Sequence, residues 1–375
     1  MKIGILTQPL GHNYGGILQN FALQHVLKAA GHVVLTLDLK RKQTWRQRAR
    51  SAAVRAVTTP LIRRIGDPRA RQRMAMQNLR ESASRLISTT GPLTAPLRSD
   101  ALMEFAFDAY IVGSDQVWRP SYSPYLPHYF LDFALETKAR RIAYAASFGN
   151  AEREFTPAEC ARFTSLLARF DAVSVREKSA IASCQQLFNR KAELCCDPTL
   201  LITADEYRRL WVNCDISPPS QRYGLRYFLD PTPEKCSAHA SACRALGLLP
   251  ISSLPDGPRE DFSALTFAPV IAPSVPDWLA LIANASFIAT DSFHGCVFSL
   301  IFRRPFFVFD NPDRGSDRIS CLLQTAGLES ALLPQGHSVA NPECLATAKI
   351  DWETSWGKIT PLVDASHAFL QRSLV

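Results

Sequence analysis

The sequence predicts an α/β protein with two Rossmann-like domains. A chain of 375 residues exceeds what one hydrophobic core usually supports, and its composition, nearly half hydrophobic and a fifth charged, is ordinary for a globular protein. Short apolar runs alternate with helical patterns in both halves of the chain. Between the halves, SPPSQRYG (217–224) has the composition of an interdomain linker. We therefore expect one domain over residues 1–215 and a second over 220–355.

The first domain opens with a predicted β-α-β unit. Residues 3–7 read as a buried strand, 8–16 as a glycine-containing loop, 17–30 as a helix closed by Gly31, and 33–38 as a second strand. The glycines at 11, 15 and 16 do not match the dinucleotide-binding spacing G-x-G-x-x-G. A dinucleotide site is therefore not expected, although Asp38 ends the second strand.

A strongly basic segment follows this unit. Residues 40–85 hold fourteen basic residues against two acidic ones, a local charge of +12 within a total of +8, so the rest of the chain carries −4. Alanine and leucine among the arginines suggest helices in an insertion over 40–90. Such basic amphipathic helices suit an anionic membrane face or a phosphate-bearing partner, and a solvated charged surface is the plain alternative. Nucleic acid is not expected, because no zinc finger, RNP motif or aromatic-interleaved repeat accompanies the charge.

Polar residues follow two further strands of the first domain. A strand over 108–112 leads into GSDQVW, which puts Ser114, Asp115 and Gln116 on a turn and Trp118 beside them as an apolar wall. Asp115 is either a helix cap or an acceptor for sugar hydroxyls. After a strand at 142–146 and a helix at 157–170, a strand at 172–175 delivers Arg176. Its guanidinium either pairs with Glu177 or a helix end, or binds a carboxylate or phosphate.

The second domain repeats the alternation. Strands are predicted at 222–229, 248–252 and 286–289 and from Pro305, with helices at 233–246, from Phe293 and at 316–326. Residues 359–374 form a last helical segment, and within 356–375 the chain could cross back to the first domain.

The turn at 290–292 is the centre of this domain. It joins a buried strand to an apolar helix, and such turns lie at the carboxyl edge of a parallel sheet, where ligands bind. The first backbone N–H groups of a helix lack partners, which makes the turn a ready anion site. Asp291 or Ser292 can cap the helix, Gly295 would let a ligand approach its first turn, and His294 is the titratable imidazole among them. A hydrogen-bonded structural histidine is the alternative.

Five segments resemble one family in their order along the chain. They are GHNYGGILQNFALQ (11–24), DAYIVGSDQVW (108–118), VSVREKSA (173–180), CDPTLL (196–201) and TDSFHG (290–295) with the later RRPFFVF. Together they resemble the polysaccharide pyruvyl transferase family. The resemblance implies the glycosyltransferase-B architecture, in which two Rossmann-like domains face each other across a cleft. It also implies transfer of pyruvate from phosphoenolpyruvate onto two sugar hydroxyls as a ketal.

This resemblance assigns expected roles to residues of the cleft. His294 is the expected acid/base, since one group titrating near neutral pH can serve both protonation of the enol ether and attack by hydroxyls. The expected donor-binding residues are Arg176, Ser292, Gly295, Arg314 and Arg318. The expected acceptor-binding residues are Asn13, Tyr14, Gly15, Gly16, Gln19, Ser114, Asp115, Gln116 and Trp118. The scheme needs no metal and no cofactor beyond phosphoenolpyruvate as co-substrate.

Two other functions remain open from the sequence. A glycosyltransferase on the same fold would use a nucleotide sugar, and a non-enzymatic cell-surface assembly partner would have a decayed site, against which the intact DSFHG turn argues. The opening MKIGILTQPL reads as a strand and no uncharged run reaches membrane-spanning length. The chain is therefore expected in the cytoplasm, where the basic segment over 40–85 would bring it to the inner face of the membrane and to the expected lipid-linked sugar acceptor. Ten cysteines without a C-x-x-C pair predict no zinc and mostly buried thiols.

Overall fold

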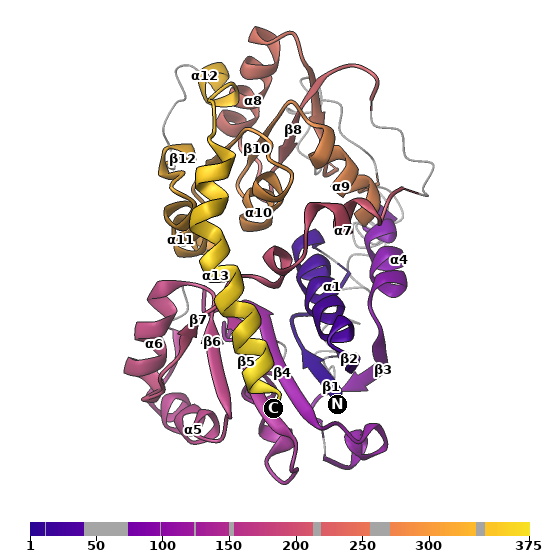
Figure 1. Ribbon diagram of the computed structural model, residues 1–375, viewed down its shortest axis with the longest axis vertical. Helices are drawn as coiled ribbons and strands as arrows, with labels where there is room; N and C mark the ends of the chain where they lie inside the picture. The colour runs from indigo at the N-terminus through magenta and orange to yellow at the C-terminus, as the bar shows by residue number, and fades with distance from the viewer. Residues whose placement is uncertain are drawn as a thin grey trace, which may run out of the picture.

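Two parallel β-sheets, one in each half of the chain, form the protein and confirm the predicted α/β fold (Figure 1). The computed structural model describes residues 1–11, 13–40, 74–97, 99–123, 125–149, 154–212, 219–255, 271–334 and 342–375. Most of the basic segment, residues 41–73, lies outside these ranges, so its predicted helices and membrane contact remain predictions from the sequence.

The first sheet has the strand order β3-β2-β1-β4-β5-β6-β7, with all neighbours parallel. The strands are β1 (Lys2–Leu6), β2 (Val33–Lys40), β3 (Thr89–Thr94), β4 (Ala109–Asp115), β5 (Arg140–Ala146), β6 (Ala172–Val175) and β7 (Glu193–Leu194). The chain moves outward from β1 to β3 and then returns to β4 on the other side of β1. A crevice therefore opens at the carboxyl ends of β1 and β4, where ligands bind in such sheets.

Helices and short 3₁₀ turns cover this sheet. Within the described ranges the helices of the first domain are α1 (Tyr14–Ala29), α4 (Gln77–Leu86), α5 (Pro157–Leu167), α6 (Lys178–Phe188) and α7 (Ala204–Arg208). The 3₁₀ segments among the described residues of both domains are η1 (Ser99–Phe105), η2 (Leu126–Phe130), η3 (Asp132–Ala134), η5 (Pro198–Leu201), η7 (Pro312–Arg314) and η8 (Glu329–Ala331). Helix α1 begins three residues before its predicted start at Ile17, because the side chain of Asn13 accepts a hydrogen bond from the Gly15 N–H and caps the helix.

The composition of the Pro- and Thr-rich stretch before Asp108 predicts a loop, and this prediction is wrong. The stretch contains strand β3, which pairs with β2 at the edge of the sheet. Pro92 lies in this strand opposite Asp38. An edge strand tolerates proline because its outer N–H groups have no ladder partner to lose.

The second sheet has the order β12-β11-β10-β8-β9, again parallel throughout. Its strands are β8 (Tyr223–Tyr227), β9 (Leu249–Ser252), β10 (Phe287–Thr290), β11 (Phe306–Phe309) and β12 (Leu332–Leu333). Its helices are α8 (Pro233–Ala245), α9 (Val275–Asn284), α10 (Phe293–Ile301), α11 (Ser316–Ala326) and α12 (Pro342–Ala346). After β9 the chain returns to the other side of β8 and forms β10 there. Because the order of the strands switches at this point, a second crevice opens at the carboxyl end of β10.

The last helix, α13 (Trp352–Ser373), runs from the second domain onto the first (yellow in Figure 1). At its start, Trp356 Nε1 donates to the Leu300 carbonyl 3.2 Å away in the second domain. Near its end, Ser366 Oγ accepts from the Cys196 N–H at 2.9 Å, and Arg372 pairs with Glu193 of the first domain. Within the described ranges, no helix is both long and apolar enough to cross a membrane.

Candidate functional site

The two crevices face each other and enclose a cavity of about 380 Å³. The first domain contributes Gln8, Pro9, Asn13, Gly16, Asp115, Gln116 and Tyr122 to its lining. The second domain contributes Leu229, Asp291, Ser292, Phe293, His294, Asn311, Arg314, Gly315, Arg318 and Ile319. A ligand in this cavity would therefore touch both domains at once.

The turn from β10 into α10 presents His294 to the cavity. His294 lies in the first turn of α10 and is buried, with 4% of its surface exposed. Neither Asp291 nor Ser292 caps the helix through its side chain, contrary to the sequence prediction. The buried Asp291 carboxylate instead accepts from the Leu229 N–H at 2.6 Å and from Lys235 Nζ at 2.8 Å, because a buried charge requires partners. The first N–H groups of α10 thus have no side-chain cap.

The structure gives Gly295 a different role from the predicted one, which was to let a ligand approach the first turn of the helix. It is absent from the cavity lining, and a Cβ at this position would overlap Oγ1 of Thr290. Glycine therefore allows α10 to start directly over the end of β10, which fixes where His294 points.

Asp197 of the first domain faces His294 of the second. Its Oδ2 lies 3.6 Å from His294 Nε2, and it also accepts from Arg176 at 2.5 Å and from Ser114 Oγ at 3.3 Å. Its Oδ1 accepts from Thr199 Oγ1 at 2.7 Å. Burial alone would raise the pKa of Asp197, but His294 and Arg176 together hold that pKa well below its ordinary range. A permanent anion is thus fixed beside the imidazole.

Gly15 holds the opposite edge of the imidazole. A Cβ at Gly15 would overlap Nδ1 of His294, so the backbone at the start of α1 lies directly against the ring. At Gly16 the space is wider, since the nearest atom to a Cβ there, Asp115 Oδ2, is 4.0 Å away. His294 is therefore clamped between Gly15 and Asp197, both from the other domain.

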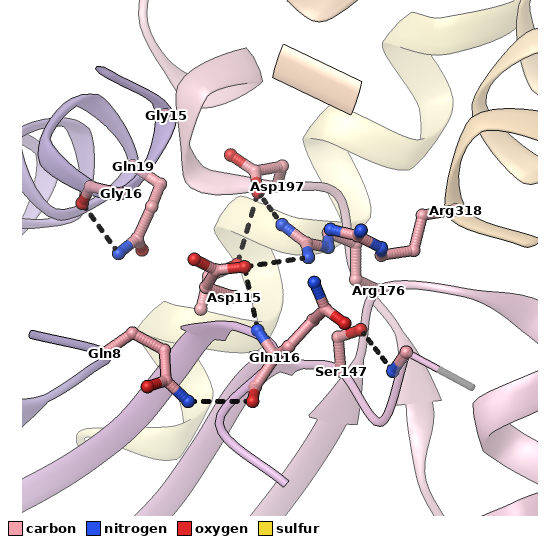
Figure 2. Close-up of polar contacts among 12 residues, drawn as sticks. Gln8, Gly15, Gly16, Gln19, Asp115, Gln116, Ser147, Arg176, Asp197 and Arg318 are labelled. Atoms are coloured by element: carbon pink, nitrogen blue, oxygen red, sulfur yellow. Dashed lines mark hydrogen bonds and ion pairs between the residues drawn. The ribbon is translucent and has the colours of Figure 1, made fainter. Parts of the chain in front are cut away.

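Arg176 lies behind the cavity wall rather than in it. Its side chain is 2% exposed and pairs with Asp197 and, at 3.5 Å, with Asp115 (Figure 2). Burial alone would lower the pKa of Arg176, but the two carboxylates and Glu177 raise it. Its guanidinium also lies 4.6 Å from the centre of the Phe293 ring. Arg176 does not line the cavity, so its predicted direct contact with the donor is not supported; it holds the carboxylates instead.

The predicted cations Arg314 and Arg318 do line the cavity. Arg318 is 7% exposed; burial first, and then the neighbouring Arg176 (Figure 2), lower its pKa to about 10. One of its nitrogens donates to the Arg314 carbonyl, while the buried Nε has no partner in the described part of the chain. A buried guanidinium with free donor capacity beside an uncapped helix start is suited to an anion. Arg314 is already paired with Asp230.

The predicted acceptor residues divide into two groups. Asn13, Gly16, Asp115 and Gln116 line the cavity, whereas Tyr14, Gly15, Gln19, Ser114 and Trp118 do not. Asp115 ends β4 with φ at +74°, a sparsely populated conformation of the kind that concentrates at functional sites.

The five that do not line the cavity, Gly15 against His294 among them, are buried in the protein. Trp118, predicted as an apolar wall, is fully buried, donates from Nε1 to the Tyr129 carbonyl and stacks on Phe130. Tyr14 stacks on Trp278 of the second domain, with ring centres 4.7 Å apart. Gln19 Nε2 donates to Thr7 Oγ1, and Ser114 Oγ lies beneath Asp197. Their positions make them supports of the site.

Several residues of the site carry no predicted role, Gln8, Tyr122 and Asp197 among them. Gln8 and Tyr122 lie in loops without a motif, so no periodicity or spacing points to them. Asp197 lies in CDPTLL, one of the segments that resemble the family. The acidic residue before a proline in this segment is the sequence feature that could have identified Asp197 as a site residue. Among the described residues, no group of three or more His, Cys, Asp or Glu side chains could hold a metal ion.

Comparisons with known proteins agree with this geometry. S. aureus MnaA in complex with UDP matches with a TM-score of 0.53 and 12% identity, covering 96% of this chain and 90% of that one. The UDP-GlcNAc 2-epimerase from Methanocaldococcus jannaschii matches with a TM-score of 0.52 and 12% identity, covering 97% and 93%. At these identities the likeness shows the fold alone, a glycosyltransferase-B-like pair of domains.

The sequence comparisons identify the family. No curated protein sequence matches the chain significantly. The family model described as polysaccharide pyruvyl transferase matches residues 13–314, a span that begins at the Asn13 cap and ends at Arg314. Because this span covers most of the chain and both walls of the cavity, the protein belongs to the polysaccharide pyruvyl transferase family, a family of enzymes.

Proposed function

We propose that the protein transfers the pyruvyl group of phosphoenolpyruvate onto two hydroxyls of a sugar in a cell-surface or exopolysaccharide precursor. The products are a cyclic ketal and inorganic phosphate. The observation that carries this proposal is the division of the cavity: His294, Arg314 and Arg318 line one wall, and Asp115 with neutral amides lines the other. A small trianion and a polyhydroxyl ligand each match one wall.

The donor fits the wall of the second domain. Phosphoenolpyruvate carries a phosphate and a carboxylate, and the Nε–H of Arg318 is a free donor beside the uncapped start of α10. Aligned backbone N–H groups at a helix start stabilise anions, and a buried guanidinium strengthens each hydrogen bond. We assign the direct donor contacts to Arg318, Ser292 and the first turn of α10, with Arg314 at the rim.

The acceptor fits the wall of the first domain. Asp115 Oδ2 faces Gly16, where the wall is open, and its carboxylate can accept a hydrogen bond from a sugar hydroxyl. Asn13 and Gln116 add carboxamides to the same wall. These groups carry no positive charge, so they favour a neutral sugar over a second anion.

The chemistry needs one group that gives and takes protons. His294 would donate a proton to C3 of the enol phosphate, leaving cationic character at C2, and would take up the proton of the first hydroxyl as that hydroxyl attacks C2. The C2–O bond to phosphate then breaks, and the second hydroxyl attacks C2 and closes the ketal while its proton passes to the departing phosphate. Asp197 stabilises the imidazolium and fixes its orientation, and Arg176 keeps Asp197 ionised from behind.

A direct assay tests this proposal. The purified protein is incubated with phosphoenolpyruvate or with UDP-hexoses and a panel of sugar acceptors, and released phosphate, released UDP and product masses are measured. We expect phosphate and a ketal only with phosphoenolpyruvate, and His294→Ala to lower the rate by roughly 10²-fold or more. Release of UDP with glycoside formation would instead support the alternative, a nucleotide-sugar glycosyltransferase on this fold.

A further inference from the structure

Tyr122 is an exposed aromatic ring of the cavity. Among the described residues, the two phenylalanine, tyrosine or tryptophan side chains in the lining differ: Phe293 is 5% exposed and has Arg176 and Arg318 near its ring, whereas Tyr122 is 41% exposed. Tyr122 follows β4 on a turn in which its N–H donates to the Arg119 carbonyl at 3.1 Å. Apolar ring surface that is exposed to water in a polar cavity is unfavourable unless a ligand covers it.

The ring is fixed from one side. The guanidinium of Arg119 lies 4.2 Å from the centre of the Tyr122 ring, a distance at which cation and π face attract. Three interactions fix Arg119 in turn. It donates hydrogen bonds to Gln116 Oε1 at 3.1 Å and to the Asp313 carbonyl at 3.2 Å, and it forms an ion pair with Glu154 at 3.4 Å. Tyr122 is thus a preorganised platform that lines the cavity.

The platform lies next to the proposed donor wall. Arg119, whose guanidinium packs on the Tyr122 ring, donates to the carbonyl of Asp313, the residue before Arg314. Tyr122, Arg314 and Arg318 line the same cavity, and so does Asp115. A ligand stacked on the ring would therefore share the cavity with the proposed donor cations and with Asp115.

We propose that Tyr122, backed by Arg119, is the stacking platform for the acceptor sugar and determines which pyranose face is presented to the donor. A pyranose has one face with several C–H bonds and a rim of hydroxyls, so it can stack on an aromatic face while its hydroxyls reach Asp115 and Gln116. This inference rests on the proposed function for its kinetic test, but not for its binding test.

The kinetic test compares three substitutions of Tyr122 with one control. Tyr122→Ala is expected to raise the acceptor KM on the order of tenfold, with the phosphoenolpyruvate KM within about twofold. Tyr122→Phe and Tyr122→Trp keep the aromatic face and should restore acceptor affinity, whereas Tyr122→Leu keeps bulk without a π face and should not. Met103→Ala, at a side chain 74% exposed outside the cavity, is the control. Equal acceptor KM for wild type, Tyr122→Ala and Tyr122→Leu would overturn the inference.

The binding test needs no turnover. Saturation-transfer NMR with methyl hexosides and methyl N-acetylhexosaminides, without phosphoenolpyruvate, should show transfer to the C–H protons of one sugar face, and this signal should be lost in Tyr122→Ala. The inference is wrong if wild type and Tyr122→Ala give the same signal, or if wild type gives none for any glycoside. If the signal depends on Tyr122 but phosphoenolpyruvate supports no transfer, the proposed function fails and the sugar site stands.

Discussion

Asp197 is a buried carboxylate whose charge the folded protein stabilises. Its substitution should therefore lower the stability of the protein as well as its activity. Its pKa is depressed in the folded state, where burial opposes ionisation but His294 and Arg176 favour it more strongly. The folded protein therefore binds fewer protons at this group than the unfolded chain. The resulting stabilisation is fully present above an unfolded pKa of about 3.9 and is lost as the pH falls towards the folded pKa.

We expect Asp197→Asn to lower the free energy of unfolding at pH 7 by about 3–5 kcal/mol, because it leaves Arg176 buried without its closest anion. Urea unfolding between pH 3 and pH 7 measures this, and the variant should lose less stability than wild type on acidification. Identical unfolding midpoints of the two proteins at pH 7 would contradict the assigned pairing.

Gly15 gives a prediction with a matched control on a different helix. Gly15→Ala should fold, since the position lies at a helix start, but its methyl group would displace the His294 ring and lower kcat by roughly 10²-fold, the contribution of a positioned acid/base. Gly357→Ala in α13 meets no atom within 4 Å and should leave kcat unchanged. A Gly15→Ala variant with wild-type kcat would show that His294 is not clamped as described.

At the scale of elements, helix α11 brings the side chain of Arg318 to the start of α10. Removing this side chain should weaken donor binding without weakening acceptor binding. Arg318→Ala is expected to weaken phosphoenolpyruvate binding roughly 10- to 100-fold, because each charge-assisted hydrogen bond contributes about 1.5–3 kcal/mol. Calorimetry checks this, with Arg244→Ala on the exposed side of α8 as the control. Donor affinity equal to wild type would mean that the phosphate lies away from α11.

The elements themselves were largely predictable, and the site only in part. Parallel strands buried on both faces read as apolar runs, so β1, β5, β6 and β10 were found within two residues of their ends. Helix α6 and the edge strand β3 have weaker patterns and were missed. Motif position located His294, Asp115 and Arg318, but it could not tell that Trp118 and Arg176 point into the protein. The direction of a side chain after a strand depends on local turns and long-range pairing, which spacing does not encode.

At the scale of the molecule, the proposed acid/base and its partner belong to different domains. His294 comes from the second domain, and Gly15 and Asp197 from the first, so the proposed catalysis depends on how the two domains are seated. Helix α13 and the stack of Tyr14 on Trp278 hold this arrangement, and Tyr14 also donates to the Pro273 carbonyl at 2.7 Å. A substitution at the contact between Tyr14 and Trp278 should therefore alter the geometry of the site, although neither side chain lines the cavity.

We expect Tyr14→Ala to lower kcat more than its loss of stability explains. The fair comparison is Phe163→Ala, because Phe163 is 2% exposed within the core of the first domain, away from the cavity. Both substitutions should cost about 3–5 kcal/mol of stability, as aromatic truncations in cores do. With both variants assayed well below their unfolding midpoints, kcat should fall at least about tenfold further for Tyr14→Ala, since loosened domains separate His294 from Asp197. Equal kcat values would mean that the two domains keep their seating without this contact.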